Sequence, residues 1–261
     1  MLCIIVPTVG NRIIEINNLF LSLQNQTNRN FYVLCMVQEN YNEISNIINK
    51  YEFDFEIIEL SKKGLSYSRN QAFKYIRKDT NYITFSDDDC WYPNNMVEKI
   101  NKIIYNDKLC LCFSIFDPYQ NLFYKKYNIS PIRGLSKLQS LKVSSIEIFV
   151  PKSIVDNNIT FDEKFGLGTL FPSGEENIFL FDLLKNKYSI NYYPDIIVFH
   201  NVPIWSNKEY IFKGKGALFT RLYNKPIAII LVLIYSLKKF TYFTNFRKQF
   251  SQMFKEVFNY N

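Results

Sequence analysis

Three consecutive carboxylates, Asp87, Asp88 and Asp89, follow the short apolar run 82–85 after a single serine. Adjacent carboxylates repel one another, and a divalent cation placed among them relieves that repulsion. Hard oxygen ligands with few protein donors suit Mg²⁺ or Mn²⁺, which can bridge to the phosphates of a substrate. The structural alternative is that the triplet makes a turn and caps a helix that begins near Pro93.

A second pair of carboxylates, Glu175 and Glu176, opens a predicted helix over residues 175–186. The helix dipole favours negative charge at that end, and a carboxylate held there suits a general base that takes a proton from a hydroxyl. However, Ser173-x-x-Glu176 also fits a capping box, in which Glu176 would only accept from a backbone N–H. The residues alone favour neither interpretation.

Four other side chains have both a chemical and a structural interpretation. His200 is the only histidine, which excludes a multi-histidine metal site; a lone histidine is more often structural, but a nearby carboxylate triplet favours metal ligation. Arg69 is either a surface residue of a helix or a ligand for a diphosphate or nucleobase. Gln38 or Glu39 can accept a hydrogen bond from the N3–H of uracil, or simply face solvent.

These residues need a sheet that brings them to one edge, and the sequence predicts one. Apolar runs alternate with helical patterns, which favours a mostly parallel, doubly wound α/β sheet. Ligands bind outside the carboxyl ends of such strands, where Pro7-Thr8, Gln38-Glu39, the aspartate triplet and His200 stand. The predicted strands are 1–7, 31–37, 55–60, 82–85, 109–116, 145–150, 190–193 and 196–199, and the predicted helices are 13–23, 43–51, 67–76, one from near 93, and 175–186.

Composition narrows the function classes. Of 261 residues, 48% are hydrophobic, so disorder is excluded as the main state. The net charge is +7, but residues 207–261 hold ten Lys/Arg and two Glu, which leaves 7 − 8 = −1 for residues 1–206. A nucleic-acid binder usually carries its basic stripe on the folded body, so no nucleic-acid partner is expected. The five cysteines form no CxxC pair and lie mostly in apolar runs, which predicts buried free thiols in a reducing, cytoplasmic compartment.

The basic C-terminal segment contains an apolar run of twelve residues, Pro226–Leu237. As a helix it would be about 18 Å long, too short for the roughly 30 Å hydrocarbon core of a bilayer. Lysines, arginines and aromatic residues flank the run, a pattern that suits the interface of an anionic membrane. The alternative is a helix that packs on the body of the protein.

Taken in order, the motifs resemble those of the family 2 glycosyltransferases over about residues 1–220: Ile4-Ile-Val-Pro-Thr8, Gly64-Leu-Ser-x-x-Arg-Asn70, Phe85-Ser-Asp-Asp-Asp89, Phe161-Asp-Glu-x-Phe-Gly-x-Gly168, Gly174-Glu-Glu176 and His200. The resemblance implies the GT-A fold, a Rossmann-like, mostly parallel sheet flanked by helices with a helical C-terminal tail. It implies a catalytic domain over 1–206, with a nucleotide-sugar half (1–116) and an acceptor half (117–206), and a separate tail over 207–261. The nearest members in appearance build bacterial capsule, O-antigen or lipooligosaccharide.

The resemblance also implies a role for each site residue. Nucleotide-binding positions are Pro7, Thr8, Gln38, Glu39, Arg69, Asp87 and Asp88. Asp89 is the principal metal ligand, with Asp87 and His200, for Mn²⁺ or Mg²⁺. Glu176 is the catalytic base, with Glu175 nearer the acceptor. Two departures stand out: Gln38-Glu39-Asn40 replaces the common Asp-Asp-Gly-Ser and leaves the nucleobase open, and Glu-Glu replaces Glu-Asp and leaves the choice of base open.

The implied activity is an inverting, metal-dependent transfer of sugar from a UDP-sugar to a saccharide hydroxyl in surface polysaccharide synthesis. The acceptor would be lipid-linked, and the protein would sit at the inner face of the cytoplasmic membrane through residues 207–261. The loop 160–173 would close over the donor. Two other functions compete: a glycoside hydrolase with a carboxylate pair, and a non-catalytic, membrane-associated protein that binds nucleotide-sugars.

Overall fold

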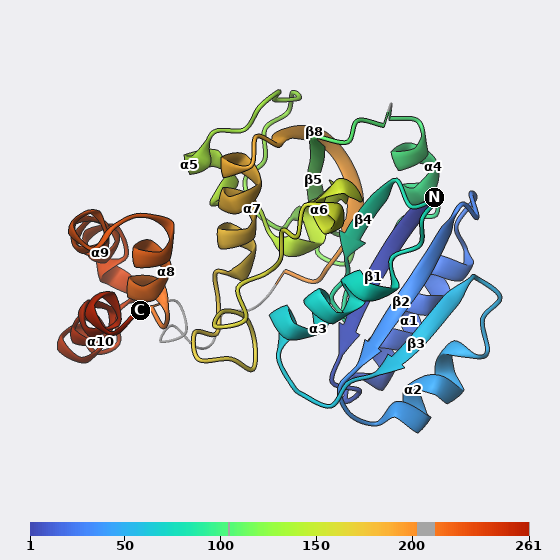
Figure 1. The fold of residues 1–261 in the computed structure, drawn as a ribbon, viewed down its shortest axis with the longest axis horizontal. Coiled ribbons are helices and arrows are strands. Elements are labelled where there is room, and N and C mark those ends of the chain that lie inside the picture. Colours follow the sequence, from blue (N-terminus) through green and yellow to red (C-terminus); the bar gives the residue numbers. More distant parts are fainter. Residues whose placement is uncertain (104, 203–211, 261) are drawn as a thin grey trace.

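A central sheet organises the protein, seen here in a computed structural model that describes residues 1–103, 105–202 and 212–260 (Figure 1). Its strands run in the order β3-β2-β1-β4-β7-β5-β6, and β8 pairs with β5. Neighbours among β1 to β4 are parallel, as are β5 and β8, whereas β7 runs antiparallel to both β4 and β5. The strands are β1 (Leu2–Thr8), β2 (Phe31–Val37), β3 (Phe55–Glu59), β4 (Tyr82–Phe85), β5 (Leu109–Asp117), β6 (Leu122–Phe123), β7 (Ile148–Pro151) and β8 (Ser189–Phe199). The predicted mostly parallel α/β sheet is confirmed.

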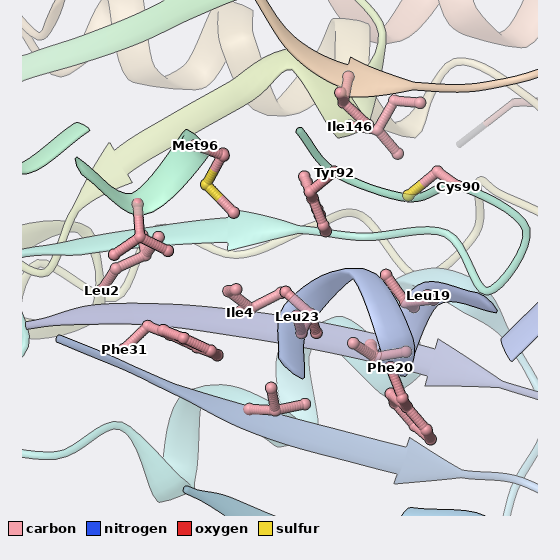
Figure 2. Close-up of a cluster of buried hydrophobic side chains, with 14 of the residues drawn as sticks. Leu2, Ile4, Leu19, Phe20, Leu23, Phe31, Cys90, Tyr92, Met96 and Ile146 are labelled. Atoms are coloured by element: carbon pink, nitrogen blue, oxygen red, sulfur yellow. The ribbon is translucent and has the colours of Figure 1, made fainter. Parts of the chain in front are cut away.

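Both faces of the sheet are covered, because successive side chains of a strand point to opposite faces. Leu2, Ile4 and Val6 of β1 belong to one buried cluster, and Cys3 and Ile5 belong to the other. Figure 2 shows the first cluster, where Ile4 and Phe31 of the strands meet Leu19, Phe20 and Leu23 of one helix. Strands buried on both faces read as continuous apolar runs, which is the pattern that the sequence shows here.

Helices connect the strands, and their bounds differ in places from the predicted ones. They are α1 (Ile13–Gln24), α2 (Tyr41–Ile48), α3 (Leu65–Ala72), α4 (Met96–Asn101), α5 (Lys137–Ser140), α6 (Ser153–Asp156) and α7 (Glu175–Lys185). The predicted helix 67–76 starts earlier and changes to a 3-10 turn at Phe73–Tyr75. The prediction missed α5, α6 and β6, which are short elements with weak patterns.

Three predicted strands were wrong in detail. Residues 190–193 and 196–199 form one strand, β8, whose pairing with β5 shifts register between Cys112 and Ser114. That irregularity accommodates Pro194 and Asp195, which interrupt the apolar pattern in sequence. The predicted strand 145–150 begins instead as a 3-10 turn, Ser145–Glu147, because a capping box between Ser144 and Glu147 tightens the chain before β7.

Three helices, α8 (Lys215–Leu222), α9 (Lys225–Lys238) and α10 (Phe246–Asn259), form a cluster beside α7, away from β1–β4 (Figure 1). Their shared core consists of Phe212, Ala228, Val232, Met253 and Val257. The predicted domain boundary at 206/207 and the start of the predicted helical stretch lie outside the described residues. The described part of the segment is helical, as predicted.

This helical cluster is tied to the loop that precedes α7. Arg221 of α8 pairs with Asp162 at 3.0 Å and with Asp182 at 2.7 Å, and the hydroxyl of Tyr260 donates to Asp162 at 3.2 Å. The carboxylate of Glu256 in α10 accepts hydrogen bonds from the backbone N–H groups of Gly214 and Gly216 at the start of α8. The C-terminal helices therefore help to hold the loop 160–173.

All five cysteines are buried and unpaired, as predicted from their apolar surroundings: Cys3, Cys35, Cys90, Cys110 and Cys112. The pKa of each thiol lies above its usual value, and burial is the largest cause of that shift. Among the described residues, the longest apolar helix falls short of what a bilayer crossing requires.

Candidate active site

A cleft of about 350 Å³ opens at the carboxyl ends of β1, β2 and β4. Seven of the residues singled out in the sequence line it: Pro7, Thr8, Gln38, Asp87, Asp88, Asp89 and His200. They share this cleft because parallel strands deliver their carboxyl ends to one edge of the sheet. Leu167 and Gly168 of the loop before α7 form part of the opposite wall.

Asp88 anchors the triplet to the end of β1. Its carboxylate accepts a hydrogen bond from the Thr8 hydroxyl at 2.7 Å and one from Arg12 at 3.1 Å. Burial raises the pKa of Asp88, and the Thr8 hydrogen bond and the Arg12 charge act against that shift. Both carboxylate oxygens are thus engaged within the protein, which makes Asp88 a positioning residue for its neighbours.

Asp89 faces His200 across the cleft. The His200 Nε2 lies 3.2 Å from an Asp89 oxygen, and Arg12 pairs with the other oxygen of the same carboxylate. Burial acts to raise the pKa of Asp89, but the hydrogen bond and charge of His200, together with Arg12, lower it overall. The triplet does form a turn, in which the Cys90 N–H donates to the Asp87 carbonyl, but α4 begins only at Met96, so the helix-cap interpretation was wrong.

Arg69 connects the aspartates to the glutamates. Its Nη2 donates to Asp87 at 3.1 Å and to the Ser145 hydroxyl at 2.9 Å, and its Nη1 lies 3.6 Å from Glu175. The side chain is fully buried, so the surface interpretation of Arg69 was wrong. Within the described residues, the buried Nη1 and Nε have no hydrogen-bond partner, although Nη1 lies within ion-pair distance of Glu175.

The aromatic rings of Phe85 and Phe161 pack edge to face against each other, and their centroids lie 5.6 Å and 5.2 Å from the Arg69 guanidinium. Asn70, the next residue, exchanges hydrogen bonds with the Phe161 backbone, since its side chain donates to the carbonyl and accepts from the N–H. The Arg-Asn pair of α3 therefore fixes the start of the loop 160–173. The Leu65 N–H donates to the Leu167 carbonyl at 3.0 Å and holds the middle of that loop at the cleft.

The glutamate pair begins α7, whose N-cap is Gly174 with φ = 100° and no side-chain cap. The predicted capping box between Ser173 and Glu176 is therefore absent and that alternative was wrong. Glu175 is buried beneath Gly166, where an added Cβ would lie 3.0 Å from Ser66 and 3.5 Å from the Glu175 side chain. Only glycine suits Gly166, because its φ of +107° also lies in the left-handed region.

Burial, followed by the charge of Glu176, raises the pKa of Glu175 from 4.5 to about 8, and Arg69 only partly offsets the shift. The folded-state pKa lies above the unfolded one, so this protonation stabilises the fold below about pH 4.5 and the benefit is lost as the pH rises through about 8. We expect the difference in Tm between Glu175→Gln and the wild type to grow in favour of the variant by roughly 5 °C or more from pH 5 to pH 9. Thermal unfolding at both pH values measures this, with exposed Glu52→Gln as the control; equal Tm differences at the two pH values would contradict it.

Gln38 and Glu39 differ in their position relative to the cleft, because only Gln38 lines it. The Gln38 side-chain oxygen accepts from the Gly64 N–H at 2.7 Å and so supports the turn that enters α3. Glu39 pairs with Lys63 and does not line the cleft, although Lys63 does. The structure therefore places one of the two residues proposed for nucleobase contact at the cleft and the other outside its lining.

Three basic residues near the acids were not singled out from the sequence. Arg12 pairs with Asp88 and Asp89, Lys63 lines the cleft, and Lys215 lies near both glutamates. Burial lowers the pKa of Lys215, and the charges of Glu176 and Glu175 act in the opposite direction. The sequence signal for Arg12 is its position just after β1, where a cation would meet a carboxylate triplet.

The donor set suits a divalent cation. Asp87, Asp89 and His200 offer carboxylate oxygens and one imidazole at the same cleft, and such ligands fit Mn²⁺ or Mg²⁺. In the described ranges, no three His, Cys, Asp or Glu side chains already converge as a metal centre. Arg12 neutralises part of the acidic charge in this arrangement, so binding of a cation would require Asp89 to exchange its Arg12 contact.

Residues 3–168 match the family model for glycosyl transferase family 2. The chain belongs to this family. The fold agrees: TarS from S. aureus (residues 1–349) superposes with a TM-score of 0.68 at 17% identity, covering 97% of this chain and 80% of TarS. TarS in complex with UDP-GlcNAc gives a TM-score of 0.66 at 17% identity, covering 97% of this chain and 81% of that one.

A mannosyltransferase from Pyrobaculum calidifontis, PcManGT, in complex with GDP-Man and Mn²⁺, gives a TM-score of 0.60 at 11% identity, covering 98% of this chain and 84% of that one. A search of curated protein sequences found no significant match. This family 2 glycosyltransferase therefore has the GT-A fold, as the motif resemblance implied.

Proposed function

We propose that this family 2 glycosyltransferase is an inverting, metal-dependent enzyme that moves sugar from a UDP-sugar to a saccharide hydroxyl. The observation that carries the proposal is the buried Arg69 bridge, which holds Asp87 of the donor cleft and Glu175 of the glutamate pair in one connected site. Family membership favours transfer over glycoside hydrolysis. UDP is proposed as the nucleotide because TarS has been seen with UDP and with UDP-GlcNAc.

The donor would lie in the cleft lined by Thr8, Gln38 and the aspartates. Asp89, with Asp87 and His200, would hold the cation, which when bound supplies positive charge against the departing nucleoside diphosphate. Asp88 and Thr8 keep the triplet at the end of β1. The loop 160–173 forms the opposite wall and excludes water that would otherwise hydrolyse the donor.

Glu176 is the proposed base. Burial and neighbouring charge keep Glu175 largely protonated at neutral pH, and a protonated carboxyl cannot take a proton. Glu175 then positions Arg69, while the partly exposed Glu176 accepts the proton of the acceptor hydroxyl. The hydroxyl oxygen attacks the anomeric carbon from the face opposite the diphosphate, so the configuration inverts in one displacement.

We propose a lipid-linked acceptor in bacterial surface polysaccharide synthesis, met at the inner face of the cytoplasmic membrane. Support comes from α9, which turns small or β-branched residues such as Ala228 and Val232 toward the helical cluster. Five of its large apolar side chains stay exposed: Ile227, Ile230, Leu233, Ile234 and Leu237. Lysines stand at both ends of α9, so the exposed face combines apolar area with positive charge, as interfacial helices do.

Substitution of Leu237, which is 77% exposed, should therefore weaken membrane binding. We expect Leu237→Glu to lower binding to vesicles of phosphatidylglycerol and phosphatidylcholine by about tenfold or more, because it removes apolar area and adds repulsion. Co-sedimentation measures this, with Leu138→Glu, a 70% exposed leucine of α5, as the matched control. Equal binding by both variants would contradict the membrane role of α9.

A thermal-shift screen of nucleotide-sugars with and without Mn²⁺ tests the donor. Ligand binding raises apparent stability by mass action, so a UDP-sugar should give the largest Mn²⁺-dependent increase in Tm. A larger shift with a GDP-sugar would overturn the UDP assignment. UDP-sugar binding without turnover on any saccharide acceptor would support the non-catalytic alternative, and NMR of a transferred sugar would report whether the anomeric configuration inverts.

A further inference from the structure

A second and larger hollow lies next to the donor cleft. It is an open groove of about 980 Å³ between α1 and the segment Trp91–Asn95 that follows the aspartate triplet. Asp89 lines both the groove and the donor cleft, so the two are continuous at that residue. The proposed chemistry at Asp87, Arg69 and the glutamates makes no use of this groove.

Three aromatic rings form one wall of the groove. The Trp91 ring lies 5.5 Å from that of Tyr119 and 6.0 Å from that of Phe199, centroid to centroid. The backbones of Trp91 and Phe199 exchange two hydrogen bonds, of 3.0 Å and 2.7 Å. This bridge fixes the Trp91 backbone before any ligand binds, so less conformational entropy remains to be lost on binding.

Tyr119 is 79% exposed, yet the turn that carries it is rigidly supported. The fully buried carboxylate of Asp117 accepts hydrogen bonds from the backbone N–H groups of Tyr119, Gln120 and Val202. A large aromatic side chain is thus held in solvent at the groove by a buried acid. Exposed rings on a rigid support are typical of binding surfaces.

Much of the remaining lining is polar, and none of the described lining residues carries a positive charge. Amide side chains come from α1, from the segment after Trp91 and from the end of β8: Asn18, Asn25, Asn94, Asn95 and Asn201. Among the described residues that line the groove, the only charged side chains are Glu15 and Asp89, and both are acidic. A phosphate, a nucleic acid or another anion would therefore be repelled.

We propose that this groove is a binding site for a neutral saccharide, namely a sugar of the acceptor chain that lies outside the reacting position. Aromatic faces cover the C–H faces of a pyranose, and asparagine amides both donate to and accept from its hydroxyls. Ile14 and Leu21 of α1, which are 75% and 48% exposed, add apolar contact on the opposite wall. The assignment of the saccharide to the acceptor rests on the proposed function, whereas the binding itself does not.

Trp91 provides a direct test that needs neither nucleotide nor metal. The chain has two tryptophans, so Trp205→Phe leaves Trp91 as the sole tryptophan reporter. This variant is titrated with maltotriose, cellotriose, mannotriose and chitotriose as probes, and we expect a saturable change in Trp91 fluorescence with at least one of them. Tyr119→Ala should raise that Kd by about tenfold, which corresponds to about 1.4 kcal/mol, because it removes an aromatic contact with the saccharide.

Tyr75→Ala, a change at a 42% exposed tyrosine elsewhere on the protein, is the matched control and should leave the Kd unchanged. No fluorescence change with any of the four probes would overturn the proposal, and so would binding that Tyr119→Ala leaves intact. In a transfer assay, Tyr119→Ala should raise the acceptor KM with little change in donor binding. Saccharide binding at Trp91 without any sugar transfer would instead contradict the proposed function and leave the groove assignment standing.

Discussion

Replacement of Asp89 by alanine should reduce sugar transfer by about a thousandfold or more and should also weaken Mn²⁺-dependent binding of the donor. Asp89 is the carboxylate that both His200 and Arg12 contact, at the point where the donor cleft meets the neighbouring groove. Alanine would leave Arg12 paired only with Asp88 and would remove the hydrogen bond and charge that raise the pKa of His200, together with the carboxylate proposed as the principal metal ligand. Initial-rate assays and thermal shifts with and without Mn²⁺ measure the two effects.

Asp79→Ala is the matched control, because Asp79 is an exposed aspartate outside the cleft. Its transfer rate and its Mn²⁺-dependent thermal shift should equal those of the wild type. Full transfer by the wild-type protein in excess EDTA would remove the metal from the proposal. Normal donor binding by Asp89→Ala would show that another residue is the principal metal ligand.

Glu176→Gln should lower kcat by about 10²- to 10⁴-fold and leave donor binding nearly unchanged. Glutamine keeps the shape of the side chain at the start of α7 but cannot take a proton, so only the chemical step should suffer. Glu175→Gln should cost less, because burial and the charge of Glu176 raise the pKa of Glu175 to about 8 and its proposed role is to position Arg69. Steady-state kinetics of both variants with a shared acceptor separate the two roles.

Glu52→Gln, on an exposed loop, controls for the loss of one carboxylate. A larger kcat loss in Glu175→Gln than in Glu176→Gln would reverse the assignment of the base. A loss of donor affinity in Glu176→Gln would instead indicate a binding role. The assay is therefore decisive between the two glutamates, which the sequence left open.

The sheet, and the residues that meet at the carboxyl ends of its strands, could be predicted from the sequence because both follow from local patterns. Continuous apolar runs predicted β1 and β2, and the rule that parallel strands end together predicted that Asp89 and His200 would meet. Pro194 and Asp195 misled the prediction of β8, since a bulge against β5 can absorb a break that the sequence pattern alone presents as a turn.

Long-range pairings could not be predicted from the sequence. Arg69 becomes buried only because Asp87, Ser145 and Glu175 arrive from three other parts of the chain to surround it. Arg12 contacts Asp88, which lies 76 positions later in the chain, and no hydrophobic pattern in the sequence indicates that contact. Ser173 fitted a capping motif in sequence, but Gly174 takes a positive φ and starts α7 without a side-chain cap.

The burial of the native cysteines makes site-specific labelling of an introduced cysteine possible. Thiolates are the reactive species, and burial raises the pKa of all five native thiols, so labelling reagents should leave them untouched in the folded protein. A cysteine introduced at an exposed position of α9, such as Leu237, would then be the one site that accepts a fluorophore or spin label. Immersion depth and orientation on a lipid surface could be measured in the otherwise native protein, without first removing a single natural sulfur atom.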